Sequence, residues 1–386
     1  MLQRDRNYYD LINYGLGGVS FQEFVDGFKT KYNELQVDGF DWDPQIQIDF
    51  TYEQLFAEIN VATLPTVVDY DSAGPYKAPD KYEVGKDKIP RFKHGFALDE
   101  KIIREQLVFL QRGGSSLVNS DIIRDLLFNS IDKLLMGNVN ERTYQRMQVV
   151  STGSYALTAE NNPAGLQGIT FNFGVNTSSL TTTARWWSSS THTTANEGSA
   201  SDPVKNLREW VVNARRHGVP NPKIEISYEL FTDMCGHSKV LAAVGHALYP
   251  SSPSDSAAAA SAQYLGAEGL RAALERLVGA PIVVRDTIAY VEKFDKTTGK
   301  IVKTAINGFN VLNVAIVPDT QLGTIKAVQP IAVPDPGARL AFFDGGRTLI
   351  KQTFNSDTNT QYIQSECTAL VVPSVAKYMY VYTVTA

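Results

Sequence analysis

Apolar residues near the middle of the chain recur at the spacing of an α-helix. Between Val118 and Met136 they lie three or four residues apart, and Asn140–Val150 resumes the same pattern beyond Gly137. The pattern predicts one long helix of roughly 45 Å, at about 1.5 Å per residue. It does not decide whether the helix is kinked at Gly137. Asn119 or Ser120 is suited to cap its first turn.

The clearest helix of the chain is predicted from Pro203 to a last turn of Arg215, Arg216 and His217. Its apolar residues line one face: Val204, Leu207, Trp210, Val211 and Ala214. Asp202 is the expected N-cap, Pro203 occupies the first helical position, and Gly218 follows the last turn. The sequence therefore predicts both ends of this helix as well as its buried face.

Shorter patterns predict further helices and strands. The expected helices are Phe21–Tyr32, Tyr228–Cys235, Ser238–Leu248 and Leu265–Leu277. The expected strands are Tyr155–Leu157, Ile169–Phe173, Lys223–Ser227, Pro281–Arg285, Ile288–Phe294, Ile301–Ile306 and Val311–Val317, followed by a β-rich tail. The Ser/Thr-rich segment 176–201 and the Ser/Ala-rich segment 251–262 are expected to be loops. The predicted fold class is α+β, with one sheet-and-helix unit inserted into another.

Two early segments are poor in residues for a core of their own. Residues 1–63 are aromatic and polar, and we expect an extended arm whose partners lie elsewhere. In residues 64–101, Tyr82–Val84 is expected to pair with Ile89–Phe96 around a turn at 85–87. The basic residues of this segment are Lys77, Lys81, Lys86, Lys88, Arg91 and Lys93. Such a charged hairpin is expected to project and dock on another subunit, and the alternative is a solvated loop.

Composition narrows the classes of protein. The chain has 386 residues, of which 43% are hydrophobic, so it can build a large core or two medium ones. Its net charge of −5 disfavours a dedicated nucleic-acid binder. Two cysteines exclude a disulfide framework and a four-thiolate zinc site. No apolar run is long enough to span a membrane, and the polar start does not resemble a signal peptide.

No pattern of catalytic, cofactor-binding or metal-binding residues emerges. Gly299-Lys300 lacks the first glycine and the hydroxyl of a phosphate-binding loop and is expected to lie in a hairpin turn. Cys235, His237 and His246 are the one candidate metal cluster, but two intervening glycines favour a structural role. The carboxylates Asp38, Asp41 and Asp43 are interpreted as a solvated acidic turn. We therefore expect no enzyme, no cofactor and no metal.

The order of these parts resembles that of tailed-bacteriophage major capsid proteins with the Hong Kong 97-type fold. Three stretches carry the resemblance, which is nearest to the phage lambda capsid protein E family. They are 64–99 with Ile-Pro-Arg-Phe-Lys-His at 89–94, Glu141–Gly174 with Ser-Thr-Gly at 151–153, and Gly279–Pro318 with Gly-Ala-Pro-Ile-Val-Val-Arg-Asp at 279–286. Each motif is degenerate, so the resemblance depends on their order along most of the chain.

The resemblance implies a shell subunit built from five parts. These are an N-terminal arm (1–63), an E-loop (64–101), a peripheral domain with a spine helix (102–201), an axial domain (202–330) and a return to the peripheral domain (331–386). It also implies self-assembly into hexamers and pentamers around double-stranded DNA, held without sequence specificity and without a membrane. Assembly in the host cytoplasm would place the chain in the virion, and a scaffolding protein, a portal and a decoration protein are further partners to consider. An encapsulin-like nanocompartment shell and a hydrolase with an inserted lid domain remain alternatives.

Overall fold

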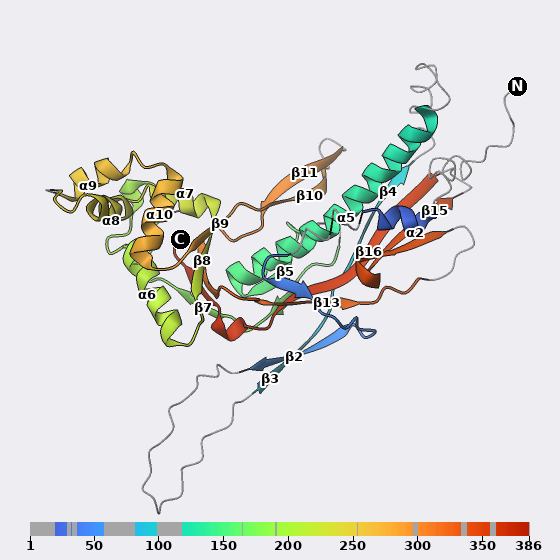
Figure 1. The fold of residues 1–386 in the computed structure, drawn as a ribbon, viewed down its shortest axis with the longest axis horizontal. Helices are drawn as coiled ribbons and strands as arrows, with labels where there is room; N and C mark the ends of the chain where they lie inside the picture. Colours follow the sequence, from blue (N-terminus) through green and yellow to red (C-terminus); the bar gives the residue numbers. More distant parts are fainter. Residues whose placement is uncertain are drawn as a thin grey trace, which may run out of the picture. The chain divides into compact units, whose positions relative to one another are not determined.

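The computed structural model describes residues 20–28, 32, 37–57, 82–98, 118–163, 165–189, 191–252, 254–295, 300–332, 338–355 and 360–385. The chain divides into two compact units (Figure 1). Unit 1 comprises Met1–Tyr52, Lys88–Arg142 and Ile325–Val371, and unit 2 comprises Glu53–Asp87, Thr143–Thr324 and Val372–Ala386. Both helices and strands are abundant, so the α+β prediction is confirmed.

Unit 1 contains a six-stranded sheet. Its order is β1-β13-β16-β15-β14, and β4 also pairs with β16. The strands are β1 (Phe40–Trp42), β4 (Arg91–Leu98), β13 (Gly323–Val328), β14 (Arg339–Phe343), β15 (Thr348–Asn355) and β16 (Thr360–Pro373). The predicted β-rich tail is thus confirmed.

Residues of the arm at Val25, Phe28 and Tyr32 pack on the core of their own unit. Helix α2 (Phe21–Asp26) begins with a capping box formed by Ser20 and Glu23. Val25, Phe28 and Tyr32 are buried in a cluster with residues of the long helix and of the sheet. These arm residues therefore find their partners elsewhere in the chain, as predicted, because their side chains pack on the long helix and the sheet of unit 1.

The predicted hairpin at 82–96 is wrong in its pairing. Strand β3 (Tyr82–Lys88) runs through the expected turn and pairs with β2 (Thr51–Ala57). Strand β4 pairs instead with β16, over eight residue pairs from Gln361↔Leu98 to Thr368↔Arg91. A hairpin around 85–87 would have offered the three residues Tyr82–Val84 as partners, so the longer ladder with β16 satisfies more backbone hydrogen bonds.

The long helix α5 spans Val118–Thr152 without interruption. Its 35 residues correspond to about 52 Å. Gly137 does not break it; a side chain there would lie 2.8 Å from Nε2 of His94, which hydrogen-bonds the Leu134 carbonyl at 3.0 Å. The glycine thus allows a close approach between α5 and β4.

Unit 2 contains a five-stranded sheet in the order β7-β17-β12-β8-β9. The strands are β7 (Asn176–Ser179), β8 (Pro222–Ser227), β9 (Ile282–Arg285), β12 (Asn313–Pro318) and β17 (Tyr380–Thr383). Its helices are α6 (Pro203–Arg216), α7 (Tyr228–Cys235), α8 (Ser238–Leu248), α9 (Asp255–Ala262) and α10 (Ala267–Val278). Two separate strand pairs are β5 (Ser154–Leu157) with β6 (Ile169–Asn172), and β10 (Ile288–Asp295) with β11 (Lys300–Asn307).

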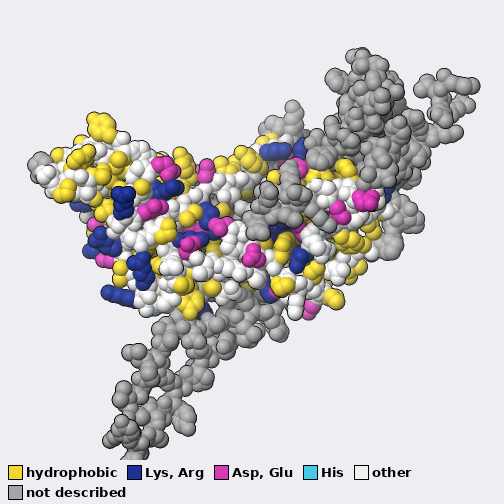
Figure 2. All heavy atoms as spheres, viewed as in Figure 1, with side chains coloured by type: hydrophobic (Ala, Val, Ile, Leu, Met, Phe, Trp, Pro, Cys, Tyr) yellow, Lys and Arg dark blue, Asp and Glu magenta, His cyan; other side chains and the backbone are white. Residues whose placement is uncertain are grey.

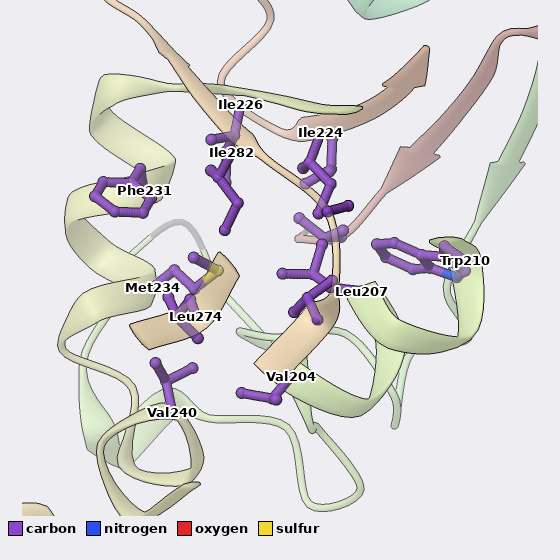
Figure 3. Close-up of a cluster of buried hydrophobic side chains, with 14 of the residues drawn as sticks. Val204, Leu207, Trp210, Ile224, Ile226, Phe231, Met234, Val240, Leu274 and Ile282 are labelled. Atoms are coloured by element: carbon purple, nitrogen blue, oxygen red, sulfur yellow. The ribbon is translucent and has the colours of Figure 1, made fainter. Parts of the chain in front are cut away.

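The core of unit 2 lies between its sheet and its helices. Leu207 of α6, Ile224 of β8 and Leu274 of α10 are buried there together (Figure 3). The predicted start of α6 is confirmed, whereas the helix ends at Arg216 and His217, predicted in its last turn, is the C-cap. The Asp202 carboxylate accepts a hydrogen bond of 3.0 Å from the Lys205 amide. This capping bond satisfies an amide that the first turn leaves without an intrahelical partner.

Both predicted loops contain ordered structure that the sequence analysis missed. Within 251–262, Ser254 caps helix α9, and its alanines at 258 and 262 are buried. Alanine has the highest helix propensity, and here it also permits close packing on α8. Within 176–201, Trp186 and Trp187 are fully buried in the core of unit 2. The structure thus corrects both predictions.

Helix α8 approaches the backbone of α9 closely at Gly245, and we expect Gly245→Ala to destabilise unit 2. A methyl group at this position would overlap with the backbone carbonyl of Ala258, which cannot move without shifting α9. The expected loss is about 1–3 kcal/mol of unfolding free energy, measured by chemical denaturation. Gly269→Ala in α10 is the control, because its methyl group would meet the Leu265 side chain at 3.2 Å. Equal stability of the two variants would contradict this packing.

Candidate functional surfaces

The six predicted contact residues of the E-loop do not form one described cluster. Lys77 and Lys81 lie outside the described residues, and Lys86 lies within β3. Lys88 ends β3, while Arg91 and Lys93 lie in β4, where Arg91 forms a 2.5 Å ion pair with Glu366 of β16. The structure therefore separates them between two sheets, and their role in contacts between subunits stays a prediction.

The strand pair β10–β11, called the ribbon below, carries apolar side chains on an exposed surface. Its strands pair antiparallel from Ile288↔Asn307 to Asp295↔Lys300. Ile288, Tyr290 and Ile301 are 50%, 70% and 67% exposed. In register, all three lie on one face of the ribbon, because alternate residues of a strand share a face. An isolated two-stranded pair is marginally stable in water, so this surface would gain from a partner.

Backbone and amide hydrogen bonds fix the base of the ribbon within unit 2. The Gly308 amide donates to the Thr287 carbonyl at 2.8 Å, which closes the base. The Gln148 side-chain amide of α5 donates to the Gly308 carbonyl, also at 2.8 Å. Asn307 donates to a Glu229 carboxylate oxygen at 3.2 Å. The ribbon therefore projects from an ordered base (Figure 1).

A buried group of three charges lies beside this base. Glu225 of β8 is fully buried and accepts two 2.6 Å hydrogen bonds from Arg146 of α5. Arg285, at the end of β9, donates to the same carboxylate at 3.0 and 2.8 Å. Burial alone would raise the pKa of Glu225, but the charges and hydrogen bonds of the two arginines lower it to about 2. These three charged residues join α5, the five-stranded sheet of unit 2 and the segment that leads into the ribbon.

Unit 1 has its own charged cluster, which corrects the interpretation of the acidic turn for Asp43, while Asp38 and Asp41 are exposed as predicted. Two guanidinium groups lie over the Trp42 ring, that of Arg142 at 4.7 Å and that of Arg347 at 5.1 Å from the ring centroid. Asp43 pairs with Lys326, and Arg347 donates to the Asp43 carbonyl at 2.7 Å. Burial would raise the pKa of Asp43, but its hydrogen bonds with Lys326 and Gln45 lower it. Asp43 therefore links this part of the arm to Lys326 of β13 and to Arg347.

The candidate metal cluster has structural roles instead. His237 is buried and caps α8, since its Nδ1 accepts from the Lys239 amide at 3.2 Å, and burial lowers its pKa. His246, in the last turn of the same helix, contacts Asp255 at 3.0 Å. Burial raises the pKa of Cys235 to about 11. Among the described residues, no three His, Cys, Asp or Glu side chains could hold a metal ion.

One acid–histidine–hydroxyl chain bears on the hydrolase alternative. His192 lies 2.6 Å from Asp233 through Nδ1 and 3.1 Å from Thr385 through Nε2, and its ring stacks on Trp187. The Thr385 hydroxyl belongs to a fully buried residue next to β17, so a substrate could not reach it without local opening. The arrangement therefore supports a packing role for His192.

None of the helices in the described part of the chain is long and apolar enough to cross a membrane.

Comparison with known proteins finds similarity in solved structures. No family model and no curated protein matches the chain. A phage-related protein from Bordetella bronchiseptica RB50 has 11% identity and a TM-score of 0.48, over 94% of this chain and 97% of its own. The putative capsid protein of a prophage from E. coli CFT073 has 12% identity and a TM-score of 0.44, over 79% and 80%. The satellite phage P4 procapsid, which includes the size determination (Sid) protein, has 10% identity and a TM-score of 0.43, over 92% of this chain and 99% of its own. Because these TM-scores lie below 0.5, the functional assignment rests on the residues of this chain.

Proposed function

We propose that the chain is a structural major capsid protein that assembles with its own copies into the icosahedral shell of a double-stranded DNA phage. The observation that carries this proposal is the order of its elements. An arm and the β2–β3 pair precede the 35-residue helix α5, an α/β unit follows, and β14–β16 return to the first sheet. This is the order expected for a Hong Kong 97-type subunit.

The described chemistry fits a structural role better than a catalytic one. Its buried charges, such as Glu225 with Arg146 and Arg285, pair with one another inside the unit. Its exposed ribbon presents apolar side chains, which favour association with another protein surface. The finer parts of the proposal are hexamers and pentamers, a scaffolding protein, a portal, a decoration protein, assembly in the host cytoplasm and a relation to the phage lambda capsid protein E family.

The E-loop proposal is kept with a narrower range. We propose that the segment between β2 and β3, with Lys77 and Lys81, lies over a neighbouring subunit. Residues from Arg91 onward are excluded from this projecting part, because β4 is paired within the six-stranded sheet.

Replacing residues 58–81 by a short Gly/Ser linker tests both the loop and the shell. We expect an unchanged melting temperature and a complete loss of closed particles in negative-stain electron microscopy, because the folded strands β2 and β3 remain while the contact is removed. A variant with the same 24 residues in scrambled order controls for length.

The outcomes separate the two ideas. Wild-type-like particles from the linker variant would overturn the E-loop assignment. A wild-type chain that forms no particle with any scaffold candidate would overturn the shell assignment itself. Nuclease-protected DNA inside the wild-type particles is expected for a phage capsid, whereas a protein cargo would favour the nanocompartment alternative.

A further inference from the structure

The exposed side of helix α6 carries an excess of basic side chains. Its exposed residues, called the basic face of α6, are Lys205, Arg208, Glu209, Val212, Arg215 and Arg216. Glu209 is the acidic exception, and its 3.9 Å pair with Lys205 is exposed and therefore weak. Lys and Arg side chains gather at the end of unit 2 that carries α6 (Figure 2). Since the whole chain has a net charge of −5, this excess is local and does not follow from composition.

The charges next to this face do not cancel it. Helix α10 packs on α6, and both of its carboxylates pair with Arg271 of the same helix, that of Glu268 at 2.8 Å and that of Glu275 at 3.9 Å. Arg276, in the last turn of α10, is exposed and adds a positive charge. Asp202 is engaged as the N-cap of α6. The surface formed by α6 and the last turn of α10 is therefore positive.

The end of α10 holds two arginines of this face in place. Arg208 donates to the Leu277 carbonyl from Nε at 3.2 Å and from Nη2 at 3.0 Å. Arg215 donates from Nη2 to the Gly279 carbonyl at 2.5 Å. A guanidinium group has five N–H donors, and these bonds do not use the Nη1 of either arginine. Because both exposed side chains are already oriented, a ligand that binds them costs less side-chain entropy.

We propose that the basic face of α6 contacts the phosphate backbone of double-stranded DNA without sequence specificity. The duplex carries one negative charge per about 1.7 Å of its length, and arginine matches phosphate in both charge and geometry. The 14 residues of α6 extend over about 21 Å, so its basic side chains can reach several phosphates. Backbone contacts of this kind hold the duplex but do not read its sequence. This contact deepens the proposed shell function and rests on it for the identity of the polyanion.

Fluorescence anisotropy of a labelled duplex of about 30 base pairs, titrated with the full unassembled chain at several salt concentrations, tests the contact. Lys205→Gln with Arg216→Gln removes two charges of the face and leaves both bonds to α10. Lys239→Gln with Lys303→Gln is the matched control, because it changes the net charge equally at two exposed positions in α8 and β11. All four residues are exposed, so both variants should keep a melting temperature near that of wild type.

The expected result is a loss of salt-dependent binding in the α6 variant alone. Wild-type affinity should fall about a hundredfold between about 50 and 200 mM salt, as for about four phosphate contacts. The slope of log affinity against log salt should be smaller by about 2 in the α6 variant and unchanged in the control. Two duplexes of unrelated sequence should bind wild type equally, because phosphates are the same in both.

The other outcomes decide between the contact and the shell. No wild-type binding to DNA, or equal binding by the two variants, would overturn the contact and leave the shell assignment standing if particles still form. Tighter binding of polyglutamate than of DNA would identify an acidic protein segment as the partner and overturn the choice of DNA. Salt-dependent DNA binding through α6, by a chain that forms no particle with any scaffold candidate, would keep the inference and overturn the proposed function.

Discussion

Glu225→Gln should destabilise unit 2 by about 3–5 kcal/mol, which is the range for removing one partner of a buried ion pair. The neutral amide keeps the shape of the side chain but removes the negative charge that Glu225 presents to Arg146 and Arg285 in the interior. Arg146 is itself fully buried, so water cannot replace the carboxylate. Chemical denaturation followed by far-UV circular dichroism would measure the loss.

Glu209→Gln is the matched control. Glu209 forms an exposed 3.9 Å pair with Lys205 one helical turn away, and such pairs contribute under about 1 kcal/mol. The difference in stability between the two variants measures the effect of burying the carboxylate, because both substitutions replace a carboxylate by the same amide. Equal stability of the two variants would refute a buried, charged Glu225.

The pH dependence of stability gives a second readout of the same prediction. The folded pKa of Glu225 lies at about 2, below its ordinary value of 4.5. The folded chain therefore holds this proton less tightly than the unfolded chain, and the contribution is complete above about pH 4.5. It is lost as the pH falls from 4.5 towards 2, so wild type should lose stability there more steeply than Glu225→Gln.

Local signals in the sequence were sufficient to predict elements whose own residues mark where they begin and end. Helix α6 has its cap at Asp202, a proline at its first position and one apolar face, and the structure shows all three features. The pairing of β4 could not be predicted from the sequence, because its partner β16 lies some 270 positions later in the chain. Nothing near Arg91–Leu98 identifies that partner, and the nearby turn residues at 85–87 favoured a wrong hairpin.

The buried charges were missed for a related reason. Glu225 stands in a short strand between Ile224 and Ile226, and a carboxylate between apolar neighbours signals either an exposed strand face or a buried ion pair. Its partner Arg146 lies 79 residues away, so the sequence alone could not decide. Two adjacent tryptophans at 186–187 were a stronger signal of a core within the polar segment, because tryptophan buries a large apolar area.

Trp210→Asp should prevent unit 2 from folding. Trp210 is 8% exposed and stacks on Tyr382 of β17, with ring centroids 4.1 Å apart and planes within 4°. It also stacks on Trp186 at 6.2 Å, and Trp186 donates a hydrogen bond to Asn206 of α6. Removing a buried tryptophan costs about 3–5 kcal/mol, and an unpaired carboxylate in its place adds a further penalty. That loss is comparable with the whole stability of a typical domain, about 5–15 kcal/mol.

Val212→Asp, two residues along the same helix, is the control for the helix face. Val212 is 37% exposed, so its aspartate can remain in water, and the melting curve should shift little. Trp210→Phe should fold with intermediate stability, because a phenylalanine ring retains part of the stacking on Tyr382. Since Tyr382 lies next to Trp210 and burial raises its pKa, near-UV circular dichroism and tyrosine titration would report the loss of this stack directly. An unchanged melting curve for Trp210→Asp would place that residue outside the core and contradict the packing of α6 on the sheet.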